Sequence, residues 1–96
     1  MSKEYYLYII TNRKAGVLYV GITNDLLRRI QEHKQGKIVG FSSKYHLYRL
    51  VYFTHTNSID EAIRSEKRIK RWKREWKIAL IEGRNPDWKD LYNELV

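Results

Sequence analysis

Residues 18–33, LYVGITNDLLRRIQEH, decide the fold, because they join a strand to a helix through one glycine. The first of them are aliphatic, β-branched or aromatic, as in a strand, and Gly21 marks the exit from it. Asn24 is a suitable N-cap for the helix predicted by the leucines and the isoleucine that follow. Arg29 and His33 are four residues apart and share one face of that helix. A domain that only had to fold would have little reason to place these polar groups here, so the segment is the first candidate for a site.

The segments on either side predict the remaining elements. Residues 5–10 (YYLYII) are apolar on both alternating faces, which is typical of a strand buried on both sides, and residues 17–21 are expected to pair with them as an antiparallel hairpin. Tyr8 and Tyr19 project from the same face if the register allows it. Residues 34–45 show no clear period and predict a mobile loop, and residues 46–54 predict a third strand.

Helices are expected after the third strand. Ser58 and Glu61 form a capping box, which opens a long helix to about Trp76. A further helix or a continuation covers residues 77–82 until Gly83 breaks it, and residues 88–95 form a last short helix. The order β-β-α-β-α-α predicts an α+β fold, a small three-stranded and mostly antiparallel sheet flanked by helices. Residues 1–96 are expected to form a single domain, with a core at about 5–80 and a C-terminal helix at about 87–95.

Charge and composition narrow the function. The chain has 19 Lys and Arg against 11 Asp and Glu, a net charge of +8, and no cysteine. The positive charge favours a polyanionic partner, with nucleic acid as the leading candidate, although a merely basic protein has the same total. The absence of cysteine excludes a disulfide framework, a thiolate metal site and a cysteine nucleophile. No secretory signal or membrane-spanning run is found, so we expect a cytoplasmic protein with no membrane partner.

Glu66 is the most informative residue outside the opening segment. It lies four residues after Ala62 and three before Ile69, on the helix stripe that otherwise faces the core. A buried carboxylate is costly unless it is paired or holds a cation. The ordinary explanation is a position at the rim of the core or an ion pair with Arg29, and the functional one is a metal ligand.

The other candidates have equally ordinary explanations when each is taken alone. Arg29 is either solvated charge or a fork that grips phosphate, and His33 either packs locally or moves a proton. Tyr8 and Tyr19 are by default sheet aromatics, and Gly21 is by default a glycine at the end of a strand. The evidence for a site is their combination.

A basic run at residues 67–77, KRIKRWKREWK, contains seven Lys and Arg in eleven residues with two tryptophans between them. We expect Trp72 and Trp76 to turn to the core. The density of cations favours contact with phosphates. The residues expected to bind nucleic acid are Lys67, Arg68, Lys70, Arg71, Lys73, Arg74 and Lys77.

The ordered combination resembles the GIY-YIG nuclease family, in particular the small single-domain proteins related to the nuclease domain of the bacterial excinuclease C subunit. The resemblance runs from about Tyr5 to Leu80 and rests on a set of ordered positions. The matching positions are Tyr8 in the first motif, Tyr19 and Gly21 in the second, the catalytic arginine Arg29, the helix histidine His33 and the metal-binding glutamate Glu66. The first glycine of the name motif is Tyr6 here, a structural position rather than a chemical one. A late asparagine of the family has no secure match, and Asn85 is assigned no role.

The resemblance implies a GIY-YIG endonuclease fold and hydrolysis of a nucleic-acid phosphodiester, most favourably in DNA and in a setting such as DNA repair. It implies that Glu66 holds one Mg²⁺, or another divalent cation such as Mn²⁺, which polarises the scissile phosphate. Arg29 would stabilise charge on the phosphoryl oxygens. Tyr8 or Tyr19 would position or deprotonate the attacking water, with help from His33.

Three interpretations stay open. The main prediction is a Mg²⁺-dependent endonuclease with little sequence specificity of its own, acting as a monomer or weak dimer and taking specificity from DNA shape or from a partner protein. The alternative is a non-catalytic nucleic-acid-binding module on the same scaffold. The basic run supports both, whereas the tyrosine, arginine, histidine and glutamate set supports only the first. An interaction module built on the Trp-rich C-terminal part is a weaker third reading.

Overall fold

The computed structural model describes residues 3–38, 40 and 44–96. Within the loop predicted at 34–45, residues 39 and 41–43 lie outside the described residues. The elements are β1 (Tyr5–Thr11), β2 (Leu18–Thr23), α1 (Leu26–Lys34), β3 (Arg49–Thr56), α3 (Ile59–Arg71), α4 (Arg74–Arg84) and the 3-10 helix η1 (Leu91–Glu94). The predicted α+β class and the order of strands and helices are confirmed.

The sheet has the order β2-β1-β3, and both pairings are antiparallel. The central position of β1 explains why its residues are apolar on both faces, since one face meets each helical layer. The register places Tyr8 opposite Gly21 and Ile10 opposite Tyr19. Because side chains alternate along a strand, this register puts Tyr8 and Tyr19 on the same face.

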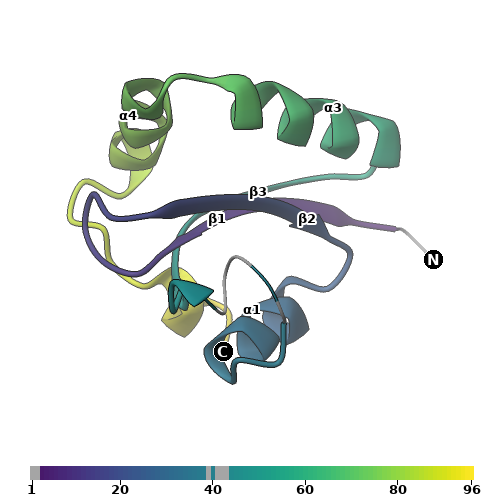
Figure 1. Cartoon of the computed structure of the whole chain (residues 1–96). Coiled ribbons are helices and arrows are strands. Elements are labelled where there is room, and N and C mark those ends of the chain that lie inside the picture. Colours follow the sequence, from purple (N-terminus) through teal and green to yellow (C-terminus); the bar gives the residue numbers. More distant parts are fainter. Residues whose placement is uncertain (1–2, 39, 41–43) are drawn as a thin grey trace.

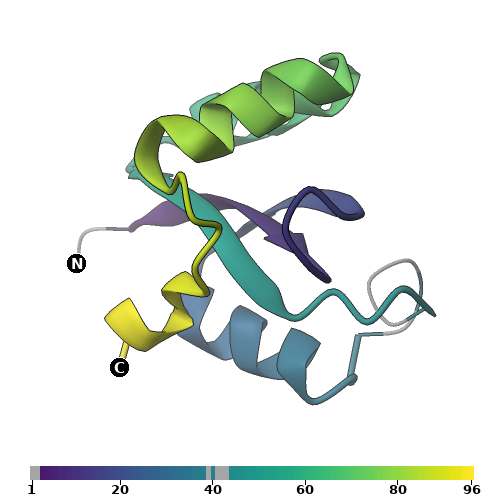
Figure 2. The same cartoon turned by 90° about the vertical axis from the view of Figure 1, so that its left-hand side faces the viewer.

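Helices cover both faces of the sheet (Figures 1 and 2). Helices α3 and α4 lie over one face, and α1 and η1 lie over the other. The core is correspondingly divided: Leu7 and Ile9 of β1 belong to the cluster under α3 and α4, and Tyr8 and Ile10 to the cluster on α1. In Figure 1, α3 passes above β2 and α1 passes below it, so residues from both helical layers can approach this edge strand. Within the described part of the chain, no helix is both long and apolar enough to cross a bilayer.

Helix α1 begins one residue later than the sequence predicts. Its N-cap is Asp25, whose side chain accepts a hydrogen bond from the backbone N–H of Arg28, so Asn24 is not the cap. Asp25 is held by its own turn, since its N–H donates to Oγ1 of Thr23. The predicted cap of α3 is confirmed: Oγ of Ser58 accepts from the N–H of Glu61 at 3.2 Å.

The predicted long helix is two helices. Helix α3 ends at Arg71, Trp72 and Lys73 are extended, and α4 runs to Arg84, so Gly83 does not break it. The interruption changes the helix direction and the phase of the apolar stripe. Trp72 packs against the core as predicted, but the prediction for Trp76 is wrong, because this side chain is 54% exposed.

The predicted helix at 88–95 is reduced to the single 3-10 turn η1. Trp88 is fully buried and has a φ of 56°, which is incompatible with a right-handed helical start. Asn85 stabilises this turn, since its side chain donates to the carbonyls of Val51 and Lys89 and accepts from the N–H of Lys89. Asn85 is therefore a buried structural residue that joins the end of α4 to β3.

Candidate active site

Three rings from three elements meet on the α1 side of the sheet. The ring centroids of Tyr8 and Tyr19 are 6.3 Å apart, and His33 lies 5.7 Å from the first and 5.8 Å from the second. Strands β1 and β2 supply the tyrosines through their register, and α1 supplies the histidine from its last turn. The structure thus brings together three of the predicted site residues.

Gly21 makes room for the Tyr8 ring. A β-carbon built on Gly21 would lie 2.7 Å from both Cζ and the hydroxyl oxygen of Tyr8, and 3.0 Å from a ring carbon of Tyr19. No real side chain tolerates contacts that short, so any larger residue would have to move the phenol. Gly21 is required by the packing of the two tyrosines. The prediction that it marks the exit from the strand is wrong, because β2 continues to Thr23 and Gly21 pairs with Tyr8 within it.

The Tyr8 hydroxyl and Nε2 of His33 form a buried hydrogen bond of 3.0 Å. Burial raises the pKa of Tyr8 to about 12, the neighbouring Arg29 opposes this rise, and the charges of Tyr19 and Glu66 add to it. Burial lowers the pKa of His33 to about 4, and the positive charge of Arg29 lowers it further, whereas Glu32 raises it. At neutral pH the phenol is therefore protonated and the imidazole is neutral.

Arg29 acts on the same phenol. The guanidinium of Arg29 interacts with the Tyr8 hydroxyl, and a guanidinium can only donate, so the phenol oxygen is the acceptor in this interaction. In the hydrogen bond with His33, the donor is set by which ring nitrogen carries the proton of the neutral imidazole.

Arg29 connects this buried group to solvent. Its side chain is 38% exposed, and Nη1 lies 3.5 Å from Oε1 of Glu32 in the same helix. Its Nε atom is buried and, among the described residues, has no hydrogen-bond partner. Beside it a cavity of about 180 Å³ opens at the start of α1. The cavity is lined by Thr23, Asn24, Asp25, Arg28, Arg29 and Glu32.

Glu66 approaches the tyrosines from the other helical layer. Its carboxylate raises the pKa of Tyr8, which places its charge within electrostatic reach of the phenol. The Glu66 side chain is 20% exposed, and its carboxylate lies 3.6 Å from Nζ of Lys70. The same ammonium lies 5.9 Å from the centre of the Tyr19 ring. The expected ion pair of Glu66 with Arg29 is not formed, because Lys70 pairs with Glu66 and Glu32 pairs with Arg29.

A single carboxylate is the metal-binding group that this arrangement offers. Among the described residues, no group of three or more His, Asp or Glu side chains could hold a metal ion together. Glu66 is partly buried and already lies against a cationic group, which shows that its surroundings accommodate positive charge. Mg²⁺ is commonly bound through one or two carboxylates, with water and substrate phosphate at the other positions. Glu66 fits such an ion.

The cations of the basic run divide by their contacts. Lys67, Arg71 and Lys73 are exposed, and Arg68 is exposed with a contact to Ser65. Lys77 donates to the carbonyl of Lys70, whose own ammonium lies by Glu66 and Tyr19. Arg74 donates to the carbonyls of Ala15 and Gly16 in the β1–β2 loop. Part of the basic run is therefore a solvated face, and Arg74 instead stabilises the β1–β2 hairpin loop.

A sequence family described as the GIY-YIG catalytic domain matches residues 4–79. The chain belongs to the GIY-YIG family. The matched range contains all five residues expected to be catalytic and all seven cations of the basic run. GIY-YIG proteins form a nuclease family, and the three-stranded sheet with helices on both faces agrees with the fold that the resemblance implied.

Small relatives of this GIY-YIG chain are found in several bacteria. A UPF0213 protein of Oceanobacillus iheyensis is 34% identical over 82 residues, which cover 85% of this chain and 94% of the relative. A UPF0213 protein of Cronobacter sakazakii is 36% identical over 84 residues, with 84% of each chain covered. The solution NMR structure of a UPF0213 protein from Bacillus halodurans has a TM-score of 0.57 at 31% identity, covering 91% of this chain and 92% of that one.

Two features of the GIY-YIG site were not predicted from the sequence. Lys70 was assigned to phosphate binding, yet its ammonium lies between the Glu66 carboxylate and the Tyr19 ring. The spacing of four residues between Glu66 and Lys70 was the available signal, because such pairs face each other on a helix. The exposed ring of Trp76 had no such signal, since neither glycine nor proline marks the break after α3.

Proposed function

We propose that this chain hydrolyses phosphodiester bonds of nucleic acid, with DNA as the favoured substrate and a divalent cation as cofactor. The observation that carries the proposal is the convergence at the β2 edge of Tyr8, Tyr19, His33 and Arg29 from one layer with Glu66 from the other. Sheet packing alone explains two tyrosines. It does not explain why an arginine, a neutral histidine and a carboxylate all act on one buried phenol.

Arg29 would bind the phosphoryl oxygens and stabilise their negative charge. Its charge is secure, because the Tyr8 phenol and the Glu32 carboxylate raise the pKa of the guanidinium. Its unpartnered Nε is a donor whose burial costs free energy until an acceptor is supplied. A phosphate oxygen that enters beside the guanidinium supplies that acceptor, and the interaction strengthens as negative charge develops.

Tyr8 would accept the proton of the attacking water, because it is the phenol that contacts both Arg29 and His33. Its raised pKa makes the free phenol a weak source of phenolate at neutral pH, so further positive charge is needed near it. His33 holds the phenol in place through Nε2 and can accept its proton. Tyr19 forms the wall of the site next to Lys70.

Glu66 would hold the divalent cation, Mg²⁺ or Mn²⁺. When bound there, the ion supplies positive charge that polarises the scissile phosphate and stabilises the leaving oxygen. The Lys70 ammonium lies against one oxygen of this carboxylate, so it would compete with the ion and, once displaced, would be available to a substrate phosphate. The net charge of +8 and the exposed Lys67, Arg71 and Lys73 support binding through the phosphate backbone, which carries no sequence preference.

The test is nicking of supercoiled plasmid with Mg²⁺ and with EDTA. Wild type is expected to nick in Mg²⁺ only, and Glu66→Gln and Arg29→Ala are expected to lose at least two orders of magnitude in rate. Glu75→Gln and Arg64→Ala remove like charges from exposed positions of α4 and α3 and serve as matched controls that keep activity. If wild type never nicks, or if both site variants nick as fast as their controls, the chain is a binding module on this scaffold and the catalytic proposal is wrong.

A further inference from the structure

Trp76 is the most exposed aromatic side chain in the described part of the molecule. It exposes 54% of its surface, against 45% for Tyr48 and 39% for Tyr45. Removing a large indole from water would be favourable, so a ring that stays in water is a candidate contact surface. The catalytic assignments above do not use it.

The indole of Trp76 is held in place. Its ring centroid lies 6.2 Å from that of Trp72, at an angle of 76° between the planes. Trp72 in turn packs against the core cluster under α3 and α4. The edge-to-face contact supports one side of the Trp76 ring and leaves the exposed part of the ring open to a planar partner.

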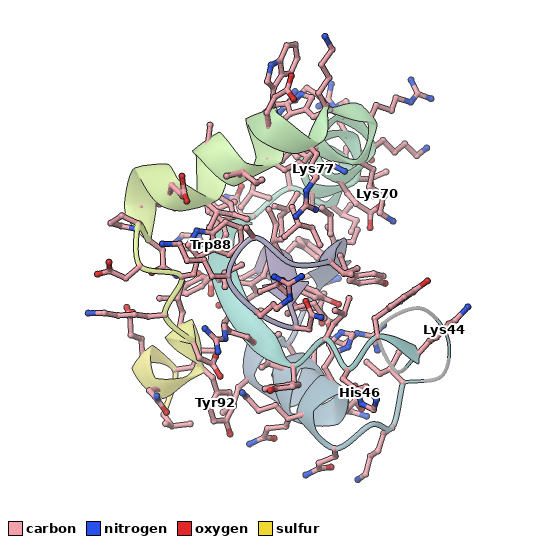
Figure 3. All side chains as sticks on the ribbon, turned by 60° about the vertical axis from the view of Figure 1, so that its left-hand side comes forward. Lys44, His46, Lys70, Lys77, Trp88 and Tyr92 are labelled. Carbon is pink, nitrogen blue, oxygen red and sulfur yellow. The ribbon has the colours of Figure 1, made fainter. Side chains whose placement is uncertain are left out.

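Cations lie next to these two tryptophans in the sequence. Lys73 is exposed three residues before Trp76, and Arg71 is exposed next to Trp72. Lys77 follows Trp76 and donates to the carbonyl of Lys70, and Figure 3 shows Lys70 and Lys77 close to each other on the two helices above the sheet. Lys70 also contacts the Tyr19 ring and Glu66. The junction of α3 and α4 thus connects the indole to the candidate active site.

The surface patch formed by Trp76, Lys73 and Lys77 is both aromatic and positively charged, and this composition indicates what binds there. A second copy of the chain would bring another +8 charge to a basic surface, which opposes self-association. An uncharged apolar partner would use the indole but leave the lysines without a role. A nucleic-acid strand uses both, because phosphates pair with the cations and a base stacks on the ring. A paired base inside a duplex has both faces covered by its neighbours, so the base has to be unpaired.

We propose that Trp76, supported by Trp72 and flanked by Lys73 and Lys77, is a stacking platform for an unpaired nucleobase. The substrate class that follows is nucleic acid with a single-stranded segment beside the bond that is cut, such as a flap or a junction. This inference rests on the proposed function for the cleavage itself, but the binding site exists independently of catalysis.

The test measures binding without cleavage. Wild type in EDTA is titrated into a labelled single-stranded oligodeoxythymidine and into a duplex of equal length, with fluorescence anisotropy as the readout. Wild type is expected to prefer the single strand, and Trp76→Ala is expected to weaken single-strand binding by about tenfold and duplex binding by less than about twofold. Trp76→Phe, which keeps a smaller ring, is expected to recover part of the loss.

Tyr48→Ala is the matched control, because it removes an exposed aromatic ring from a residue outside α3 and α4. It is expected to leave the preference for single strands unchanged. A cooperative unfolding transition in urea checks that each variant is folded.

Equal binding of single strand and duplex by wild type, or an unchanged single-strand affinity in Trp76→Ala, would overturn the platform. Loss of binding to vesicles of phosphatidylcholine and phosphatidylserine in Trp76→Ala, with single-strand binding intact, would assign the patch to membranes and also overturn it. The outcomes separate the two proposals. If Trp76→Ala weakens single-strand binding but wild type does not nick plasmid, only the proposed nuclease activity is contradicted. If wild type nicks plasmid but Trp76→Ala binds single strands normally, only the stacking platform is contradicted.

Discussion

The hydroxyl oxygen of Tyr8 lies where a β-carbon on Gly21 would approach to 2.7 Å. Gly21→Ala therefore has to displace the phenol that holds His33 and Arg29. We expect the variant to lower the free energy of unfolding by about 1–3 kcal/mol, as overpacking of a tight site does. Urea denaturation measures this effect, and plasmid nicking should fall together with it.

Gly83→Ala is the matched control for this substitution. Gly83 lies in α4, and a β-carbon there meets nothing within 4 Å. Alanine is the better helix former, so this variant should be more stable by roughly 0.5–1 kcal/mol. Equal effects of the two substitutions would show that Gly21 is only an ordinary strand glycine.

The neutral state of His33 predicts acid sensitivity. Its pKa is about 4 in the folded chain, against a reference value of 6.5, so the unfolded chain binds the extra proton first. This contribution to stability is complete above pH 6.5 and is lost as the pH falls toward 4. The loss should reach roughly 3 kcal/mol, at about 1.4 kcal/mol per pH unit.

His33→Gln should flatten this acid limb, and urea denaturation between those pH values measures it. His46→Gln removes an exposed histidine and serves as the matched control, which should keep the limb. Proton NMR of the His33 ring in wild type measures its pKa directly. A value near the reference would contradict the buried and neutral imidazole.

The sequence predicted the parts of this structure that depend on local pattern. The strands followed from apolar runs, and Arg29 and His33 shared a helix face because of their spacing. The register between Tyr8 and Gly21 was not available, because a hairpin loop of this length does not fix it. The break at Trp72 depends on tertiary packing and was not predicted. The exposure of Trp76 follows from this break and was therefore not predicted either. The predicted helix at 88–95 was wrong because Trp88 is buried with a left-handed backbone, which a right-handed helix does not contain.

Tyr8 predicts how the cleavage rate depends on pH. Burial raises the pKa of its phenol to about 12, so the phenolate fraction increases about tenfold for each pH unit below that value. In saturating Mg²⁺ the rate should rise with pH between about 7 and 9 in wild type and in Tyr19→Phe. Tyr8→Phe should lose both the rate and the slope. If Tyr19→Phe loses the slope instead, Tyr19 is the base.

Lys70 predicts the metal affinity of Glu66. Its ammonium lies 3.6 Å from the carboxylate and competes with any cation that binds there. Lys70→Met should increase the affinity for Mn²⁺ by roughly two- to fivefold, the scale of a partly exposed ion pair. Titration followed by electron paramagnetic resonance of free Mn²⁺ measures this without substrate. Lys67→Met, an exposed lysine of the same helix, should leave the affinity unchanged, and Glu66→Gln should abolish binding.

Substitutions of Arg74 and Arg71 should have different effects on stability and on DNA binding, although both residues belong to the basic run. Arg74 donates to the carbonyls of Ala15 and Gly16, so Arg74→Ala should lower the free energy of unfolding by roughly 1–2 kcal/mol. The Arg71 side chain is exposed and has no hydrogen bond or ion pair in the described part of the chain, so Arg71→Ala should change stability by less than about 0.5 kcal/mol. If Arg71 contacts a phosphate, its removal should instead reduce the slope of log affinity against log salt concentration by about one. Urea denaturation and DNA titrations at several salt concentrations measure both effects. If Arg74→Ala and Arg71→Ala change stability and salt dependence equally, the basic run acts as a single charged face. The contact of Arg74 with the hairpin would then not distinguish Arg74 from its neighbours.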